Sequence, residues 1–456
     1  MQPFSINHYL ALRIQVVKNN TITHFRPGIC QGLLAISPVV IFLLLYVVVS
    51  LVIRDFYSMP VVTALFVASV WSIAFFRGNY GVHQRIEVFS KAAANPNILF
   101  MIWIFVLAGA FASLAKNTGA IDSIVRATLG IFPVELLLPG LFIAACLISI
   151  SIGTSVGTIV ALAPLGVSLA ETTESNVALF VGVILGGAFF GDNLSFISDT
   201  TIASTRTQGC SMSDKFKANI RIALPAALIT IVILYFMSPD CHYELPADEG
   251  NLWLMLPYLL VIVLSVIGVN VAVVLTVGIA VAFVLGLTAG FTPIELCQFI
   301  GHGIDSMGDL TLITLLAAGM LGVVKHQGGI DFILDGMKSI VRGPRGCQWC
   351  IAMLTGIVNL CTANNTVAII TVGPMVKDMA ETYGVDPRKS ASLLDTSSCI
   401  VQCLIPYGAQ TLLATSLAGI SPIAPFAYLY YPWILAGMVA IAIVFNIPSF
   451  KSDNKA

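Results

Sequence analysis

The sequence predicts an all-α polytopic membrane protein with about ten transmembrane helices and two re-entrant hairpins, arranged as two inverted repeats with broken helices. Composition is the first observation behind this prediction. Of the 456 residues, 57% are hydrophobic and only 10% are charged, whereas soluble domains carry roughly 25% charged residues. The second observation is a series of apolar stretches of membrane-spanning length, and the third is a similarity between the two halves of the chain. No soluble domain of any size is expected.

Apolar stretches about long enough to cross a ~30 Å hydrocarbon core recur along the chain. We expect single spans near residues 33–53, 60–76, 98–115, 176–205, 222–238, 251–268, 270–288, 308–325, 390–415 and 427–446. Two further apolar segments, 133–170 and 347–380, are too long for one span, and small polar residues interrupt each near its middle ("GTSVGT" and "CTANNT"). Each of these segments predicts a re-entrant hairpin that enters and leaves the membrane on the same side.

The distribution of lysine and arginine predicts the orientation in the membrane. With these spans and hairpins, only Arg54, Lys116 and Arg126 fall on one side, and all other lysines and arginines lie on the opposite side. By the positive-inside rule, the tails at 1–32 and 448–456 are cytoplasmic, as expected of a multi-pass protein of a bacterial inner membrane. The net charge of −1 argues against a nucleic-acid partner, so the expected surroundings are the lipid bilayer.

An internal repeat links the two halves of the chain. The segment "SLAKNTGAID" (113–122) matches "GVVKHQGGID" (322–331) at an offset of 209, and Glu171 falls on Glu381 at an offset of 210. An odd number of crossings in each half would place the halves in opposite orientations, which is the inverted-repeat plan of secondary transporters. We expect five spans and one hairpin in each half, the first half in residues 33–240 and the second in residues 251–447.

Four interruptions of the apolar segments predict broken helices. They lie at Thr154–Ser155, at Asn364–Thr366, in "GDNLSFISD" (191–199) and in "QCLIPYGAQ" (402–410). Glycine and proline interrupt helices, and the freed backbone groups then need water or protein partners. Broken helices at corresponding positions of inverted repeats usually meet near the middle of the bilayer and form the transport site.

Two carboxylates lie within the third of these breaks, Asp192 and Asp199. A carboxylate at the centre of a membrane helix costs about 2.5–3.5 kcal/mol on insertion scales, so a bound cation or proton is the expected compensation. In an ideal helix the two aspartates would lie about 10 Å apart, and an unwound stretch permits a closer approach. We therefore expect a cation and protons to compete at Asp192 and Asp199, which is the physical basis of antiport. The other expected ligands are Asn193, Ser195, Ser198, Thr200, Thr154, Ser155, Asn364, Asn365, Thr366 and Asp395.

The stretch "FFGDNLSFISDTT", together with "RKSASLLDTSSCIVQCLIPYG" in the second half, resembles the NhaC family of sodium/proton antiporters. The resemblance covers the chain from about Leu33 to Ile447, and the family pattern is similar to G-D-x-x-S-x-x-S-D-T-T. It implies alternating access, with sodium exported as protons enter. Relatives of similar sequence exchange organic acids or amino acids with cations, so the resemblance also leaves a small organic solute open as cargo.

Structural roles compete with each of these assignments. Asp192 and Asp199 could cap a half-helix, and Asp395 could cap Thr396–Ser398. Asn364 and Asn365 could satisfy only the backbone of the hairpin tip. The matched Lys116 and Lys325 lie at span ends, where a long side chain reaches the interface, and we assign them no role in transport. Cys347 and Cys350 are read as small packing residues rather than a metal or redox motif.

Other functional classes find little support in the sequence. A channel or a membrane-embedded enzyme is the alternative, but neither H-E-x-x-H nor G-x-x-x-x-G-K-[ST] occurs. We expect no enzymatic activity and no resident cofactor, only transported sodium and protons. The sequence leaves open whether the protein is a homodimer, and which solute, if any, accompanies the ions.

Overall fold

The computed structural model describes residues 29–53, 60–76, 78, 80–121, 123, 125, 133–196, 198–238, 252–267, 269–338 and 341–448. In this part of the chain every regular element is a helix. The predicted N-terminal tail up to residue 28, the loop 239–250 and nearly all of the C-terminal tail lie outside the described residues. Seven helical stretches are long and apolar enough to cross a bilayer, and five shorter apolar helices accompany them. The predicted all-α polytopic membrane fold is confirmed.

The helices follow one another in two series. The first series is α2 (Ile29–Ile53), α3 (Val61–Ala74), α4 (Val82–Ala93), α5 (Pro96–Asn117), η1 (Val134–Leu136), α7 (Leu137–Ile152), α8 (Ser155–Thr172), α9 (Val177–Leu194), α10 (Asp199–Gln208) and α11 (Met212–Met237). The second is η2 (Leu252–Met255), α12 (Leu256–Val266), α13 (Val271–Thr288), α14 (Pro293–Asp305), α15 (Gly308–His326), α16 (Gly329–Lys338), α17 (Gly343–Thr362), α18 (Asn365–Tyr383), α19 (Pro387–Leu404), α20 (Ala409–Ala418), η3 (Ala424–Tyr428) and α21 (Tyr430–Val444).

The helix boundaries repeat with the offset found in the sequence. α8, α9 and α10 begin at Ser155, Val177 and Asp199, and α18, α19 and α20 begin 210 residues later. The caps repeat as well, because α10 and α20 both end at a left-handed glycine, Gly209 and Gly419, where the absence of a Cβ makes a positive φ cheap. Equivalent local conformations at equivalent positions indicate that α8–α10 and α18–α20 are two copies of one structural unit.

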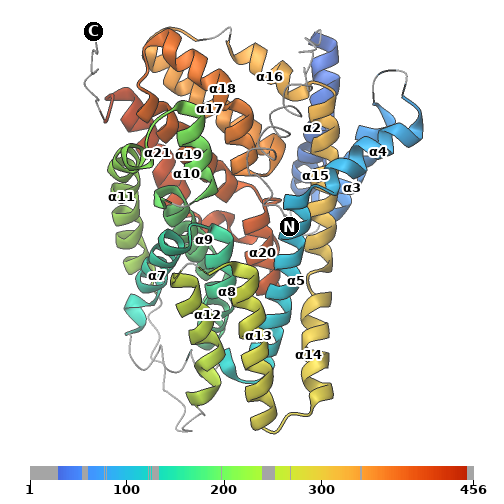
Figure 1. Cartoon of the computed structure of the whole chain (residues 1–456), viewed down its shortest axis with the longest axis vertical. Coiled ribbons are helices and arrows are strands. Elements are labelled where there is room, and N and C mark those ends of the chain that lie inside the picture. Colours follow the sequence, from blue (N-terminus) through green and yellow to red (C-terminus); the bar gives the residue numbers. More distant parts are fainter. Residues whose placement is uncertain are drawn as a thin grey trace, which may run out of the picture.

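Helices of the first series pack against helices of the second series. α5 of the first series packs against α13 and α14 of the second. Its counterpart α15 packs in the same way against α3 and α4, the counterparts of α13 and α14. Likewise α10 packs on α18, and α20 packs on α8. α4 lies in the upper part of Figure 1 and α14 at its lower end, so α5 and α15, which follow them, run in opposite directions. These reciprocal contacts are consistent with the inverted-repeat plan expected from the sequence.

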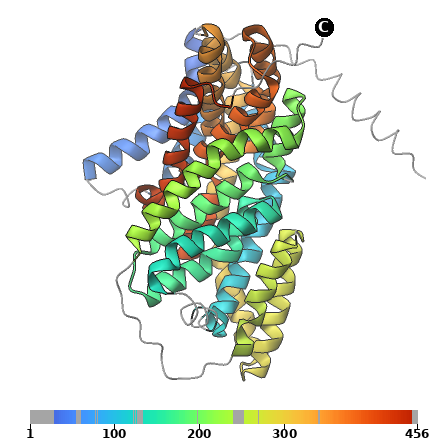
Figure 2. The same ribbon diagram turned by 90° about the vertical axis from the view of Figure 1, so that its left-hand side faces the viewer.

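Two groups of helices result, and each contains members of both series. We call α3, α4, α5, α13, α14 and α15 bundle A, and α7–α11 with α17–α21 bundle B, since these helices pack mainly within their own group. α12 packs on both α13 and α7, and it stands with α13 at the lower end of the molecule (Figure 2). All four predicted breaks fall in bundle B. This bundle therefore carries the candidate site.

The sequence analysis missed two amphipathic helices, α4 and α14. α4 and α14 lie in stretches that the sequence analysis left between spans, and with 12 and 13 residues they are short amphipathic helices. α14 begins with a capping box, in which Thr292 caps the helix and Glu295 bonds back to the Thr292 backbone, a strong local helix signal. These two helices occupy equivalent places and pack on α15 and α5.

Candidate functional site

α9 places the carboxylate of Asp192 in the interior of bundle B. Small residues make this approach possible: a Cβ on Gly191 would lie 2.3 Å from Ser149 Cβ and 2.6 Å from the Ile150 backbone nitrogen of α7. The close packing also brings the Ser149 hydroxyl within 2.6 Å of the Ala188 carbonyl of α9. α9 ends at Leu194 and α10 begins at Asp199, with Ser198 as its N-cap. Asp192 therefore lies in the last turn before the break.

Hydrogen bonds join Asp192 to the other three predicted breaks. The Ser155 hydroxyl, at the start of α8, donates to Asp192 Oδ2 at 3.0 Å, and the Ser198 hydroxyl donates to Oδ1. Ser155 accepts from Gln410 Nε2 at 3.2 Å at the start of α20. Gln402 Nε2 in turn donates to Gln410 Oε1 at 2.9 Å and to the Ala363 carbonyl at 3.1 Å, beside the second hairpin break. One chain of side chains thus connects both hairpins and both broken helices.

A second buried carboxylate, Asp395 of α19, lies beside this chain. Its Oδ2 accepts from Lys215 Nζ in an ion pair and from Asn219 Nδ2 at 3.1 Å, and both charged side chains are shielded almost completely. Asp395 and Lys215 both lie within electrostatic reach of Asp192.

Asn193 connects the ion pair to the broken helix. Its backbone carbonyl accepts from Lys215 Nζ at 2.6 Å and from Asn219 Nδ2 at 3.1 Å. The last carbonyls of a helix lack intrahelical partners and carry partial negative charge, so a cation is stabilised there. The Asn193 side-chain oxygen accepts from Asn219 at 2.5 Å and from Thr396 at 3.3 Å. The end of α9 is therefore held by α11 and α19 together.

The structure places the predicted ligands in three groups. Asp192, Asn193, Ser155, Ser198 and Asp395 meet in the buried network described above. Ser195 and Thr200 are buried beside it: the Ser195 hydroxyl donates to the Ile150 carbonyl at 3.0 Å, and the Thr200 hydroxyl lies 2.9 Å from that of Ser198. The remaining predicted ligands lie at the hairpin tips or outside the network, and they are Thr154, Asn364, Asn365, Thr366 and Asp199.

Asn364 and Asn365 serve the hairpin backbone in this structure. Asn364 Oδ1 caps α18 by accepting from the Val367 backbone amide at 2.9 Å, and Asn365 Oδ1 accepts from the Thr366 amide at 3.0 Å. Thr154 is the N-cap residue of α8, with its side chain half-buried. These contacts match the backbone role that the sequence analysis kept open for the two asparagines.

Asp199 does not join Asp192. As the first residue of α10, it has an exposed side chain, whereas Asp192 is 5% exposed. The unwound residues between α9 and α10 turn the chain so that Ser198, rather than Asp199, reaches the Asp192 carboxylate. Asp199 thus lies outside the hydrogen-bonded network, and the carboxylate whose charge acts on Asp192 is that of Asp395.

Four buried residues of the network were missed in the sequence: Lys215, Asn219, Gln402 and Gln410. Lys215 was counted among the loop cations, although its side chain lies inside the protein. The spacing of Lys215 and Asn219 is a signal that could have revealed them, since residues four apart share one helix face. Gln402 and Gln410 lie in the predicted break of the second half, and Gln402 falls 210 residues after Asp192.

The side chains around Asp192 offer oxygen ligands rather than the nitrogen and sulfur ligands that select transition metals. In the described residues, no group of three or more His, Cys, Asp and Glu side chains is placed to hold a metal ion. Cys347 and Cys350 are buried in α17 and form no disulfide with each other. The network instead supplies carboxylate, hydroxyl and amide oxygens, which are the ligands of hard cations.

Comparison with known proteins agrees with this donor set. The family model described as "Na+/H+ antiporter family" matches residues 17–238 and 249–448. The chain belongs to the Na+/H+ antiporter family. This antiporter family member is 25% identical over 396 residues to the Na(+)/H(+) antiporter NhaC of Bacillus subtilis, with 78% of this chain and 84% of the relative covered.

Other relatives of this antiporter family member are named for different cargo. The malate-2H(+)/Na(+)-lactate antiporter of Bacillus subtilis is 22% identical over 430 residues, covering 86% of this chain and 90% of the relative. The arginine/ornithine antiporter ArcD of Halobacterium salinarum is 22% identical over 465 residues, covering 92% of each chain. A solved structure, the Alcanivorax borkumensis YdaH transporter, aligns with a TM-score of 0.40 and 12% identity over 91% of this chain and 98% of its own.

Proposed function

We propose that this protein exports sodium in exchange for protons by alternating access, with Asp192 as the shared cation and proton site. The observation that carries this proposal is the charge of the buried network. Asp192 and Asp395 contribute two negative charges and Lys215 one positive charge, so the cluster is left with one uncompensated charge when all three are ionised. One sodium ion or one proton neutralises it, and the two therefore exclude each other.

The surroundings of Asp192 suit this competition. An isolated buried charge is costly unless it is paired, and among the described residues Asp192 receives hydrogen bonds from the hydroxyls of Ser155 and Ser198. A hydroxyl can turn its lone pairs toward a sodium ion as readily as it donates to a carboxylate. The same residues can thus serve the ion-bound and the protonated states. Lys215 holds Asp395 and the end of α9 in both the ion-bound and the protonated state.

Alternating access fits the arrangement of the breaks. The Asp192 network joins both hairpins and both broken helices of bundle B, and bundle A packs beside them. Movement of one bundle against the other would expose the site to each side in turn. With the orientation predicted from the Lys/Arg distribution, both termini face the cytoplasm of a bacterial cell.

Coupled flux in proteoliposomes tests the proposal. With a higher sodium concentration inside the vesicles than outside, sodium exit should drive protons inward against the proton gradient. A channel cannot drive one ion uphill in this way. Asp192→Asn keeps the size of the side chain and removes its charge, so it should abolish the coupled flux while the protein remains folded. Lys217→Gln, an exposed cation two residues from Lys215, is the matched control and should transport normally. Uncoupled sodium flow, or normal exchange by Asp192→Asn, would refute the assignment.

Exchange of a small organic acid or amino acid is the second candidate function. The names of two relatives favour it, since one is called a malate-2H(+)/Na(+)-lactate antiporter and the other an arginine/ornithine antiporter. Counterflow of labelled malate, lactate, arginine and ornithine into the same proteoliposomes distinguishes the candidates. Sodium–proton exchange at full rate without any added solute would favour the first candidate, and a strict requirement for one of these solutes the second.

A further inference from the structure

A cavity of about 340 Å³ lies between bundles A and B. The walls come from the C-terminal parts of α5 and α20, from α8, and from the junction of α14 with α15. α5, α14 and α15 belong to bundle A, whereas α8 and α20 belong to bundle B. A cavity between the two bundles is the place where their separation would begin.

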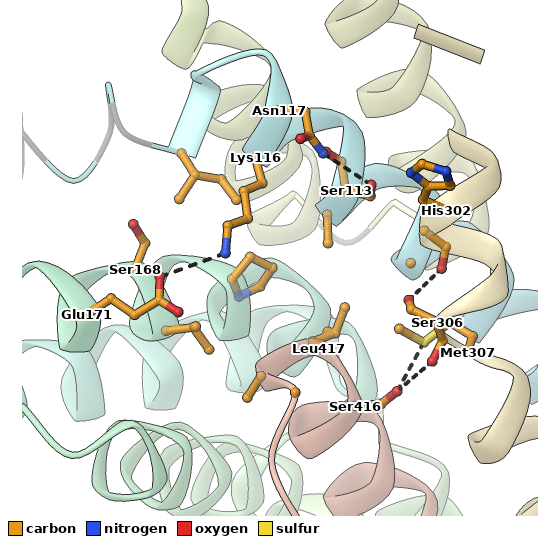
Figure 3. Close-up of a pocket in the computed structure, with 18 residues that line it drawn as sticks. Ser113, Lys116, Asn117, Ser168, Glu171, His302, Ser306, Met307, Ser416 and Leu417 are labelled. Carbon is orange, nitrogen blue, oxygen red and sulfur yellow. Dashed lines mark hydrogen bonds and ion pairs between the residues drawn. The ribbon is translucent and has the colours of Figure 1, made fainter. Parts of the chain in front are cut away.

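Two polar contacts cross this cavity from one bundle to the other. Lys116 Nζ of α5 lies 3.8 Å from Glu171 Oε2 of α8, and the two side chains point toward each other (Figure 3). The Ser416 hydroxyl of α20 donates to the Ser306 carbonyl at 3.3 Å. The Lys116 and Glu171 side chains are 67% and 53% exposed, so water competes with their ion pair and the contact is weak. A weak contact can form and break in each transport cycle.

The internal repeat supplies an equivalent pair elsewhere. Lys116 corresponds to Lys325 at an offset of 209, and Glu171 corresponds to Glu381 at an offset of 210. Lys325 lies near the end of α15 in bundle A, and Glu381 lies near the end of α18 in bundle B. Both are exposed, and within the described residues neither forms an ion pair. α5 and α15 run in opposite directions (Figure 1), so their C-terminal ends lie toward opposite ends of the molecule.

We propose that Lys116–Glu171 and Lys325–Glu381 are alternative latches between the bundles, each closing one end of the transporter while the other is open. This inference rests on the alternating-access exchange proposed above. In this structure the first latch is formed and the second is open. Because the two copies of the repeat have equivalent helices and reciprocal packing, exchanging their conformations would turn each arrangement into the other. Lys116 and Lys325 are then positioning residues for the exchange, rather than anchors at the membrane surface.

Cysteine cross-linking tests this reciprocity. In a variant lacking the ten native cysteines, Lys116→Cys with Glu171→Cys forms one pair, and Lys325→Cys with Glu381→Cys forms the other. A short bifunctional thiol reagent should link each pair in a fraction of the molecules. With all four cysteines present, linking the first pair should reduce linking of the second in the same molecule at least tenfold. The control pair is Glu87→Cys with Lys91→Cys, an ion pair within α4 at 2.7 Å, which should link equally in both states.

The outcomes separate this inference from the proposed function. Cross-linking reports conformation and needs no knowledge of the cargo, so reciprocity would stand even if sodium and protons were the wrong ions. Exchange should also stop when either pair is linked and resume when the link is cleaved. Both pairs linked together in one molecule, or exchange that continues with a pair linked, would overturn the latches.

If the cysteine-free protein fails to fold, charge reversal in the native chain replaces the cross-linking experiment. Lys325→Glu should slow exchange at least tenfold, and adding Glu381→Lys should restore the rate. Equal rates in the single and double variants would contradict the proposal.

Discussion

Lys215 of α11 and Asp395 of α19 form an ion pair whose side chains are only 1% and 0% exposed. Removing one partner of a buried pair leaves the other charge unpaired and typically costs about 3–5 kcal/mol, whereas an apolar replacement of both is often tolerated. The pair also fastens the end of α9, because Lys215 bonds to the Asn193 carbonyl. It therefore joins three helices at the candidate site.

We expect Lys215→Met to lower the free energy of unfolding by about 3–5 kcal/mol, since Asp395 would be left without its cation. The double variant Lys215→Met with Asp395→Leu should regain much of this loss. Thermal unfolding of the detergent-solubilised protein measures both effects, and Lys217→Met, on the exposed side of α11, controls for the loss of a lysine. A Lys215→Met protein as stable as this control would show that the pair contributes little.

Sodium affinity should depend on pH because one proton competes with one ion at Asp192. Where protons occupy the site, the apparent affinity for sodium should fall about tenfold for each unit of decreasing pH. Asp192→Asn should abolish sodium binding, whereas Asp199→Asn should preserve it, since Asp199 is exposed and outside the buried network. Calorimetric titration between pH 5 and 8 provides the measurement. Binding that is independent of pH would contradict a shared carboxylate site, and binding lost in Asp199→Asn alone would place the ion at Asp199 instead of Asp192.

The packing of α9 on α7 depends on glycine. A Cβ on Gly187 would lie 2.6 Å from Ala145 Cβ and 2.7 Å from the Phe142 carbonyl oxygen, and the latter belongs to backbone that cannot easily move. Gly187→Ala should therefore destabilise the protein by about 1–3 kcal/mol, the usual cost of overpacking. Gly140→Ala in α7 is the matched control, because nothing lies within 4 Å of its Cβ. Equal melting temperatures for the two variants would show that α9 can shift to make room.

The helix breaks were predictable because glycine, proline and clustered small polar residues mark them locally. The sequence places breaks within residues 191–199 and 402–410, and the helices there end at Leu194 and Leu404. The repeat offset was also visible in the sequence, and it predicts equivalent helices in the two halves. α4 and α14 were missed because, with 12 and 13 residues, each is too short to cross a bilayer, and a search for spans passes over such helices even where a capping box marks one.

The composition of the site could be predicted only in part. Asp192 was recognisable because a carboxylate in an apolar segment demands compensation. Which neighbouring residue compensates the charge of Asp192 depends on how the chain turns after Leu194. Spacing alone could not show that Ser198 faces Asp192 while Asp199 faces outward. Lys215 resembled a loop cation, because its burial comes from packing against α9 and α19 rather than from its local sequence.

Asp386 caps α19, the helix that carries Asp395. Its carboxyl accepts from the Arg388 backbone amide at 2.8 Å and from the Arg388 guanidinium at 2.9 and 2.8 Å. Burial raises the pKa of Asp386, but the bonds from Arg388 outweigh burial and hold the pKa below its usual value. A group whose pKa is lowered by folding stabilises the folded state above its unfolded pKa, and this contribution is lost as the pH falls through the folded value.

We therefore expect Asp386→Ala to lower the free energy of unfolding by about 1 kcal/mol near neutral pH, as loss of an N-cap usually does. The difference from the unmodified protein should shrink as the pH falls below about 4, the ordinary pKa of an aspartate, because the protonated carboxyl no longer binds Arg388 as strongly. Thermal melts at several pH values, with the exposed Asp378→Asn as control, measure this. A difference that stays constant down to pH 3 would mean that Asp386 acts through packing rather than through its charge.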